Sequence, residues 1–245
     1  MDKTKQLEIP KDNKEPIIPI EIMNQKTVQE LLDSFHVSID PFMKVMTQYQ
    51  CAAIEVETKF KVLNMSMAID GEKNPIESIK TRIKNPDSII RKLLRQGYPV
   101  NLESIQEYIY DVAGVRVVCS FIDDIYRVEE LFLRQDDIKL IRRKDYIENP
   151  KDSGYRSLHL VVETPIFTDD GKKDIKVEVQ MRTIAMDFWA SLEHKLRYKK
   201  DLDKDTLERL GSELEECATY SSLLDQKMQA IRDELLSLQD KSKLM

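Results

Sequence analysis

The hydrophobic pattern of this chain changes its period along the sequence, and this change restricts the fold more than any other feature. In the middle of the chain, short segments rich in β-branched residues read as strands: 115–121, 138–142, 157–163 and 175–181. Helical patterns lie between and around them, at 87–95, 101–110 and 124–135. Strands interleaved with helices predict an α/β (α+β) fold, in which helices flank one mixed central β-sheet.

Longer helical patterns lie on either side of this region. Apolar residues recur every three or four positions from Phe42 to Met67, and they follow a heptad rhythm from Leu207 to Leu238. One small α/β core needs less apolar surface than these two stripes offer, and an uncovered apolar seam promotes aggregation. We therefore predict that the long terminal helices assemble a homo-oligomer. The alternative is that the two helices pack on each other within one chain.

Composition excludes several classes of protein. Lys and Arg number 38 against 44 Asp and Glu, which gives a net charge of −6. Proteins that bind duplex DNA are usually basic, so nucleic acid is a disfavoured partner, although an RNA partner stays open. Cys51, Cys119 and Cys217 lack CxxC spacing, which argues against a disulfide framework or a zinc finger. No apolar stretch approaches the ~18 residues of a membrane span, and the charged N-terminus does not resemble a signal peptide. We expect a cytoplasmic protein with no membrane partner.

The segment RIKNPDSIIRK predicts a binding site for a polyphosphate. Arg82 and Lys84 share one face of an extended chain, and Asn85-Pro86 is a favourable helix start. Ser88 and Lys92 then share one helix face near an N-terminus that favours anions. The alternative is a solvated basic surface.

In the segment DVAGVRVVCSF, Asp111 directly precedes a strand, where loop carboxylates often meet a ligand. Arg116 lies on the strand face opposite Val115 and Val117. A buried arginine needs an anion or a ring as its partner, so a ligand and an edge salt bridge are both open.

The segment KDYIENPKDSGYRSLHL predicts a loop of about fourteen residues. Loops of this length inside a compact domain are usually functional. Lys144 and Lys151 would suit the phosphates of a nucleotide, and an exposed Tyr155 would suit its base. His159 alternates with leucines and faces away from them.

The segment IKVEVQMRT alternates cleanly between an apolar face and a polar face that includes Glu178 and Gln180. An amphipathic edge strand would give the same alternation. However, Asp111 and Glu178 are the acids best placed to hold Mg²⁺, which prefers one or two carboxylates plus substrate phosphates.

In order and spacing, these four segments and AMDFWASLEH resemble the synthetase domain of the RelA/SpoT homologues, over residues 74–198. Chain length places the sequence among the small alarmone synthetases. None of its three histidines is followed by Asp, so no HD hydrolase signature occurs, and no room remains for TGS or ACT domains.

The resemblance implies a nucleotidyltransferase-like synthetase fold, in which ATP donates its β,γ-pyrophosphate to the 3′-hydroxyl of GTP or GDP and AMP is released. Its implied donor residues, which bind ATP, are Arg82, Lys84, Ser88, Lys92 and Arg116. Its implied acceptor residues are Lys144, Lys151, Tyr155, His159 and Gln180. Asp111 and Glu178 would be catalytic and hold Mg²⁺, with Glu178 as the base.

The sequence pattern and the resemblance together divide the chain into three parts. Residues 1–26, which are polar and contain Pro10, Pro16 and Pro19, are expected to form a flexible arm. Residues 27–200 would form the (p)ppGpp synthetase domain, and residues 201–245 a helical segment that assembles a homotetramer.

Two departures stand out. Asp187 replaces an asparagine that helps to hold the acceptor in RelQ-type members. Ser78-Ile79-Lys80 replaces an aromatic residue and a threonine at an allosteric site, which favours the RelP type. Acceptor preference and regulation stay open.

Two rival functions remain. A nucleotidyltransferase would transfer NMP, but the GS motif followed by DxD that such enzymes carry is absent. A non-catalytic nucleotide-binding regulator would tolerate loss of Asp111 or Glu178, and both are present.

Overall fold

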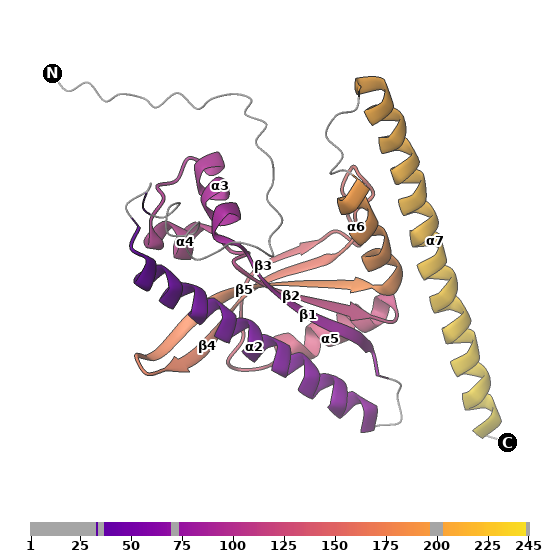
Figure 1. The fold of residues 1–245 in the computed structure, drawn as a ribbon. Helices are drawn as coiled ribbons and strands as arrows, with labels where there is room; N and C mark the ends of the chain where they lie inside the picture. The colour runs from indigo at the N-terminus through magenta and orange to yellow at the C-terminus, as the bar shows by residue number, and fades with distance from the viewer. Residues whose placement is uncertain (1–32, 34–36, 70–73, 197–202, 244–245) are drawn as a thin grey trace.

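The computed structural model describes residues 33, 37–69, 74–196 and 203–243 of the chain (Figure 1). The predicted N-terminal arm lies outside the described residues. Five strands form one sheet in the order β1-β2-β5-β4-β3. Their bounds are β1 Ile76–Ile83, β2 Ala113–Cys119, β3 Lys139–Asp145, β4 Leu158–Thr168 and β5 Gly171–Thr183. The central strands β2 and β5 run parallel, and the other neighbouring pairs are antiparallel. The mixed sheet is as predicted, and the four predicted strand segments coincide with β2 to β5.

Helices α2 (Ile39–Ile69) and α5 (Ile122–Leu133) cover one face of the sheet. Figure 1 shows α2 running across the strands. The two helices meet where the rings of Phe60 and Phe132 stack with centroids 4.3 Å apart. Val115, Val177 and other alternate residues of β2 and β5 point to this side and are fully buried. Burial of this apolar layer supplies the main stabilisation of the fold.

The predicted apolar stripe of α2 is buried against the core of its own chain. Phe42, Tyr49, Val56 and Phe60 are almost fully buried in the main core cluster. The expectation that this stripe exceeds what the core needs is therefore wrong, because a five-stranded sheet presents a face wide enough to cover a helix of 31 residues. The stripe does not form an exposed seam.

Helices α3 (Pro86–Gln96) and α4 (Leu102–Tyr108) join β1 to β2. The predicted start of α3 is confirmed. Asn85 Oδ1 accepts a hydrogen bond from the Ser88 backbone N at 2.8 Å, with proline in the first turn. Gly97 ends α3 with φ of 77°, a left-handed conformation that glycine adopts without strain.

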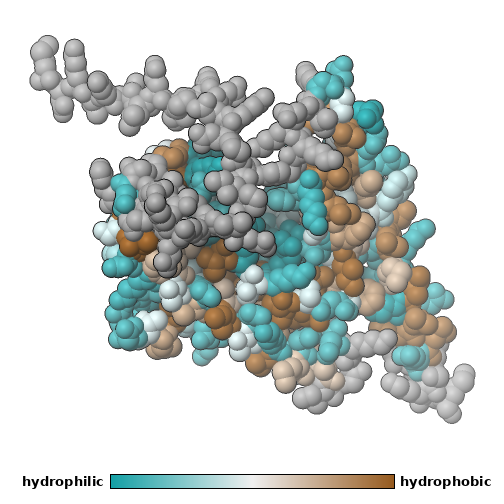
Figure 2. Space-filling view, in the orientation of Figure 1, coloured by the Kyte–Doolittle hydropathy of each residue, from teal (hydrophilic) through white to brown (hydrophobic). Residues whose placement is uncertain are grey.

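Helices α6 (Ile184–Leu196) and α7 (Lys204–Lys243) lie together beside the sheet, and α7 contacts α6 and α5 (Figure 1). Apolar side chains gather along both helices in the space-filling view (Figure 2). The large exposed ones on α7 are Leu207, Tyr220, Leu223, Leu224, Met228, Ile231, Leu235, Leu236 and Leu238. Within the described ranges, no helix is long and apolar enough to cross a membrane.

Candidate active site

The face of the sheet opposite α2 carries polar side chains in rows that cross the strands. Cross-strand pairing aligns one residue from every strand in a single row: Lys80, Arg116, Gln180, His159 and Lys144. Paired residues of neighbouring strands point to the same side of a sheet. Four of these five residues are predicted site residues, so the register brings the donor and acceptor segments onto one face.

The next row along the strands contains Arg82, Gly114, Glu178, Val161 and Arg142. Gly114 has no side chain, so β2 places nothing between Arg82 and Glu178 in this row. Arg82 is exposed on β1. Its positive charge acts on Arg116 and contributes to a lowered Arg116 pKa, after the larger effects of burial and of Arg182. Arg82 and Arg116, two of the residues implied to bind ATP, therefore lie in successive rows of adjacent strands on one face of the sheet.

Asp111 lies just before β2 and is bound by both predicted phosphate-binding lysines. Lys84 Nζ donates to Asp111 Oδ2 and Lys92 Nζ donates to Asp111 Oδ1, each at 2.8 Å. Burial raises the pKa of Asp111, but the hydrogen bonds and charges of the two lysines outweigh it, so the pKa lies below its usual value. The carboxylate is ionised at neutral pH and its charge is matched by the lysines.

Glu178 projects from β5 and is held by two neighbours. Gln180 Nε2 donates to Glu178 Oε2 at 2.9 Å, and His159 Nδ1 lies 3.5 Å from Glu178 Oε1. Burial and the charge of Asp111 raise the pKa of Glu178. The hydrogen bonds of His159 and Gln180 and the charge of His159 outweigh them and lower it. Glu178 is therefore a second ionised carboxylate on the same face.

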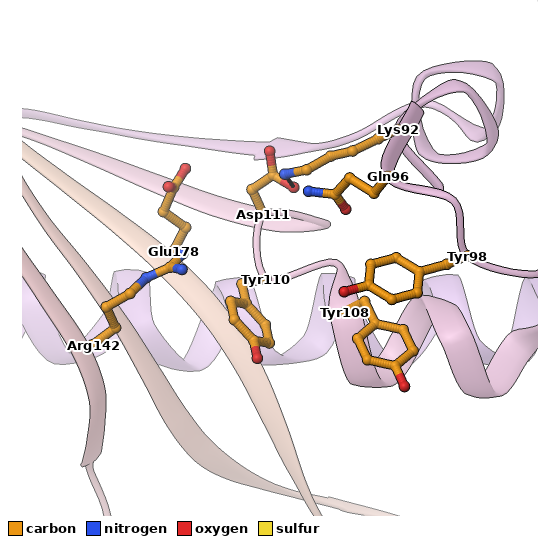
Figure 3. Close-up of a pocket in the computed structure, with 8 residues that line it drawn as sticks. All are labelled: Lys92, Gln96, Tyr98, Tyr108, Tyr110, Asp111, Arg142 and Glu178. Atoms are coloured by element: carbon orange, nitrogen blue, oxygen red, sulfur yellow. Dashed lines mark hydrogen bonds and ion pairs between the residues drawn. The ribbon is translucent and has the colours of Figure 1, made fainter. Parts of the chain in front are cut away.

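A cavity of about 230 Å³ connects the two carboxylates (Figure 3). Lys92 and Gln96 reach it from α3, whereas Glu178 and Arg142 reach it from β5 and β3. The remaining lining residues are Tyr98, Tyr108, Tyr110 and Asp111. Among the residues that the structure describes, no group of three or more His, Cys, Asp and Glu could hold a metal alone. Two carboxylates beside room for a phosphate chain fit Mg²⁺, which keeps waters and substrate oxygens as ligands.

Sequence reasoning missed the aromatic side of this cavity. The rings of Tyr98 and Tyr108 stack with centroids 3.8 Å apart and an interplanar angle of 2°. The Arg142 guanidinium lies 5.0 Å from the centroid of the Tyr110 ring, and Lys176 Nζ lies 4.9 Å from it. Three tyrosines between positions 98 and 110 were the only signal in the sequence.

The loop between β3 and β4, residues 146–157, is named here the acceptor loop. Its Tyr155 is half-buried, which corrects the expectation of an exposed ring. The Tyr155 hydroxyl accepts a hydrogen bond from Arg182 Nη2 at 2.8 Å and is hydrogen-bonded to His159 Nε2 at 2.8 Å. Lys151 Nζ lies 4.9 Å from the Tyr155 ring centroid and 4.7 Å from that of Tyr146. Lys144 and His159 belong to strands rather than to the loop.

Asp187, the residue that departs from the RelQ pattern, is the counter-ion of two arginines. Its Oδ1 lies 3.0 Å from Arg182 Nη1 and 3.3 Å from Arg116 Nη1. Burial and the charge of Arg182 lower the pKa of Arg116, while Asp187 opposes them. The Nε atoms of both arginines are buried with no hydrogen-bond partner in the described part of the chain. Arg182 was not among the predicted site residues, although the alternation of β5 placed it on the polar face.

Comparison with known proteins agrees with this geometry. The family model described as "Region found in RelA / SpoT proteins" matches residues 81–203. The GTP pyrophosphokinase YwaC of Bacillus subtilis is 40% identical over 83% of this chain and 96% of its own length. The GTP pyrophosphokinase YjbM of the same organism is 36% identical over 80% of this chain and 90% of its own.

Solved structures of small alarmone synthetases are similar to this chain as well. Small alarmone synthetase 1 from Bacillus subtilis, solved with its product pppGpp, superposes with a TM-score of 0.72 at 35% identity, covering 79% of this chain and 97% of that chain. Small alarmone synthetase 2 from Bacillus subtilis superposes with a TM-score of 0.70 at 42% identity, covering 79% of this chain and 98% of that chain. The chain therefore belongs to the RelA/SpoT family and is similar to its small alarmone synthetases.

Proposed function

We propose that this protein is a GTP/GDP 3′-pyrophosphokinase that makes (p)ppGpp and lacks a hydrolase activity. One observation supports the proposal most strongly: two ionised carboxylates, Asp111 and Glu178, line one cavity on a sheet face that also carries the cationic donor and acceptor residues. The related GTP pyrophosphokinases and the synthetase solved with pppGpp support the same chemistry.

In the proposed reaction, the 3′-hydroxyl oxygen of GTP or GDP attacks the β-phosphorus of ATP. The bond between that phosphorus and the oxygen that bridges it to the α-phosphorus breaks, so AMP leaves with the bond electrons. The hydroxyl proton passes to the Glu178 carboxylate, which the structure keeps ionised. Such transfers depend mainly on positioning and on neutralisation of charge.

The donor residues position ATP and neutralise the charge of its phosphates. Lys84 and Lys92 bind Asp111 through short hydrogen bonds and can turn to the phosphates of ATP when a metal ion offsets the carboxylate charge. Ser88 lies at the start of α3, where free backbone N–H groups favour anions. Arg82 and Arg116 lie on adjacent strands and would hold adenine between them.

Asp111 and Glu178 would hold Mg²⁺, which neutralises phosphate charge when bound. Treatment with a chelator should abolish product formation, and added Mg²⁺ should restore it. Full activity in chelator would contradict the metal assignment.

The acceptor residues lie at the other end of the site. Tyr155 would contact guanine, and Lys144, Lys151, His159 and Gln180 would contact the acceptor phosphates and ribose. Lys151 already lies over the Tyr155 ring. We therefore infer that a base stacking on this ring displaces Lys151 toward the phosphates.

Identification of the products separates the proposal from its rivals. Incubation with ATP, GTP and Mg²⁺ should yield AMP and a pyrophosphorylated guanosine nucleotide in equal amounts. Release of inorganic pyrophosphate with transfer of a nucleoside monophosphate would support the nucleotidyltransferase alternative. Binding of both nucleotides without turnover would support a regulator.

We also propose that the protein is a homotetramer assembled through α7, the main part of the predicted segment 201–245. Leu224 and Ile231 are more than half exposed on α7 within a line of exposed apolar residues, and such a line on one chain favours association. Leu224→Glu with Ile231→Glu should split the tetramer, as measured by light scattering, whereas Lys227→Glu on the same helix should not. A wild-type mass near 28.7 kDa would contradict the proposal.

The compartment and subtype are proposals as well. A cytoplasmic location fits free Cys51, Cys119 and Cys217 thiols, since reducing compartments keep thiols unpaired. Localisation by fractionation tests it. The RelP type remains our prediction from Ser78-Ile79-Lys80, and nucleotide titrations that reveal allosteric activation by (p)ppGpp would contradict it.

A further inference from the structure

The tip of the acceptor loop rests directly on the C-terminal helix α7. Gly154 has φ of +80°, and a Cβ atom added there would lie 2.4 Å from Ala218 Cβ, far inside van der Waals contact. Ala218 is 6% exposed, on a helix whose other side chains are mostly exposed. The loop backbone therefore approaches α7 so closely at Gly154 that a Cβ atom there has no room.

The same junction includes the only tryptophan of the chain. Trp189 on α6 donates from Nε1 to the Leu214 carbonyl oxygen of α7 at 3.0 Å. Its ring belongs to a small apolar cluster with Ala190 and Ala218, against which Tyr155 packs. Loop, α6 and α7 thus meet in one buried contact, separate from the main core.

Two further hydrogen bonds fix α7 to the end of β5 and to α6. The hydroxyl of Thr183, the last residue of β5, donates to Asp225 Oδ2 at 2.6 Å, and both residues are buried. Ser221 Oγ donates to the Ala185 carbonyl oxygen at 3.0 Å. The helix is therefore held in register against the strand that carries Glu178.

A short chain of contacts leads from this junction to the reacting groups. Gly154 precedes Tyr155, whose hydroxyl is hydrogen-bonded to His159 Nε2 at 2.8 Å. The other ring nitrogen of His159 lies 3.5 Å from Glu178 Oε1. A shift of the loop tip away from α7 would move Tyr155 and disturb the contact of His159 with Glu178.

We propose that α7 positions the acceptor loop through the contact of Gly154 with Ala218, which makes Ala218 a positioning residue for the acceptor nucleotide. The inference rests on the proposed pyrophosphate transfer. It gives α7 a second role besides assembly: the helix supports the loop that carries Lys151 and Tyr155 in its own chain. Most donor residues lie on β1 and α3, and Arg116 on β2 is linked to Tyr155 only indirectly, through Asp187 and Arg182. ATP binding should therefore depend on this junction less than GTP binding does.

Kinetics of five variants test the proposal. Gly154→Ala should raise the KM for GTP by about tenfold or more, since small displacements in such sites carry large rate effects, while the KM for ATP changes less than about twofold. Combining it with Ala218→Gly should restore most of the loss, because the added Cβ would then meet only the Ala218 and Glu215 Cα positions at 3.9 and 4.0 Å. Gly171→Ala, at φ of +97° with nothing within 4 Å, controls for backbone strain and should leave both KM values unchanged.

Ala218→Gly alone provides a test that adds no atom. It should raise the KM for GTP by about threefold relative to Ala230→Gly, which makes the same change at an exposed position of α7. Light scattering of each variant should show the same mass as wild type, so that a KM change is not due to altered assembly. A double variant no better than Gly154→Ala, or equal effects on GTP and ATP, would overturn the proposal.

Trp189 fluorescence reports the contact without relying on turnover. Gly154→Ala should shift the emission to longer wavelength as the junction opens, and the double variant should reverse the shift. Unshifted emission in Gly154→Ala would overturn the positioning role of α7. A wild-type protein that forms no pyrophosphorylated product would instead overturn the proposed function, so the two failures are distinguishable.

Discussion

Asp187 is predicted to stabilise the fold as the shared counter-ion of two arginines. The perturbation is Asp187→Ala, which removes the carboxylate without adding volume. In the wild-type protein, Asp187 Oδ1 lies 3.0 Å from Arg182 Nη1 and 3.3 Å from Arg116 Nη1. The variant therefore leaves the two arginines without this shared negative charge. The pKa of Arg116 lies below its usual value, mainly because of burial and next because of the charge of Arg182.

The size of the effect follows from the exposure of each partner. The side chain of Arg182 is 6% exposed, whereas that of Arg116 is 33% exposed. Breaking a buried ion pair by removing one partner costs about 3–5 kcal/mol. Arg182 meets this condition, but it keeps hydrogen bonds to Tyr155 and Gln180, and solvent screens Arg116. We therefore expect the free energy of unfolding to fall by about 2–4 kcal/mol.

Asp187→Asn separates charge from hydrogen bonding. The amide oxygen can still accept from Arg182, so the loss should be about half that of Asp187→Ala, or ~1–2 kcal/mol.

The assay is urea unfolding at fixed protein concentration without nucleotide, followed by circular dichroism. Glu130→Ala is the matched control, because Glu130 pairs with Arg134 on the exposed surface of α5 at 2.5 Å. Exposed pairs of this kind contribute under about 1 kcal/mol. An Asp187→Ala protein as stable as the Glu130→Ala protein would refute the reasoning.

Three further predictions concern the site itself. Glu178→Gln should lower kcat by at least about 100-fold with an unchanged circular dichroism spectrum, as expected for loss of a general base. The control variant Glu163→Gln on β4 should retain activity. Residual turnover of Glu178→Gln above about a tenth of wild type would remove Glu178 from the catalytic role. Asp111 should stabilise the fold with a defined pH dependence, since its folded pKa lies below the unfolded value of 3.8. The stability lost in Asp111→Asn should therefore be constant between pH 7 and about 5 and shrink as the pH falls below 3.8; a loss that grows on acidification would contradict the assignment. Tyr155→Ala should raise the KM for GTP by about tenfold or more and leave that for ATP nearly unchanged, and Tyr155→Phe should lie between it and wild type, because it keeps the ring but loses the hydroxyl that joins Arg182 to His159; equal KM changes for both substrates would assign Tyr155 to loop folding.

Local pattern was sufficient to predict the elements that carry the site. Alternation along β5 placed Glu178 and Gln180 on the polar face, because successive side chains of a strand point to opposite sides. Asn85 followed by Pro86 located the start of α3, since cap chemistry depends only on neighbours in sequence. The order and spacing of the four segments indicated the family.

Contacts between segments that are far apart in the sequence could not be predicted from it. The stacked Tyr98 and Tyr108, the guanidinium of Arg142 over Tyr110, and Asp187 between two arginines all depend on which strands lie adjacent and in what register. No single segment contains that information, because register is set jointly by the turns and by the burial of the whole sheet.

The two long helices show most clearly which features the sequence determines and which the tertiary structure decides. Their sequences both predict an amphipathic helix, because the period of apolar residues determines which face is apolar. Only the tertiary structure decided that α2 buries this face on its own sheet while α7 leaves most of its apolar residues exposed. It also decided that the one small residue of α7 in contact with Gly154 lies beneath the acceptor loop. A periodic pattern specifies a surface, and the partner of that surface is fixed by the arrangement of the other elements in space.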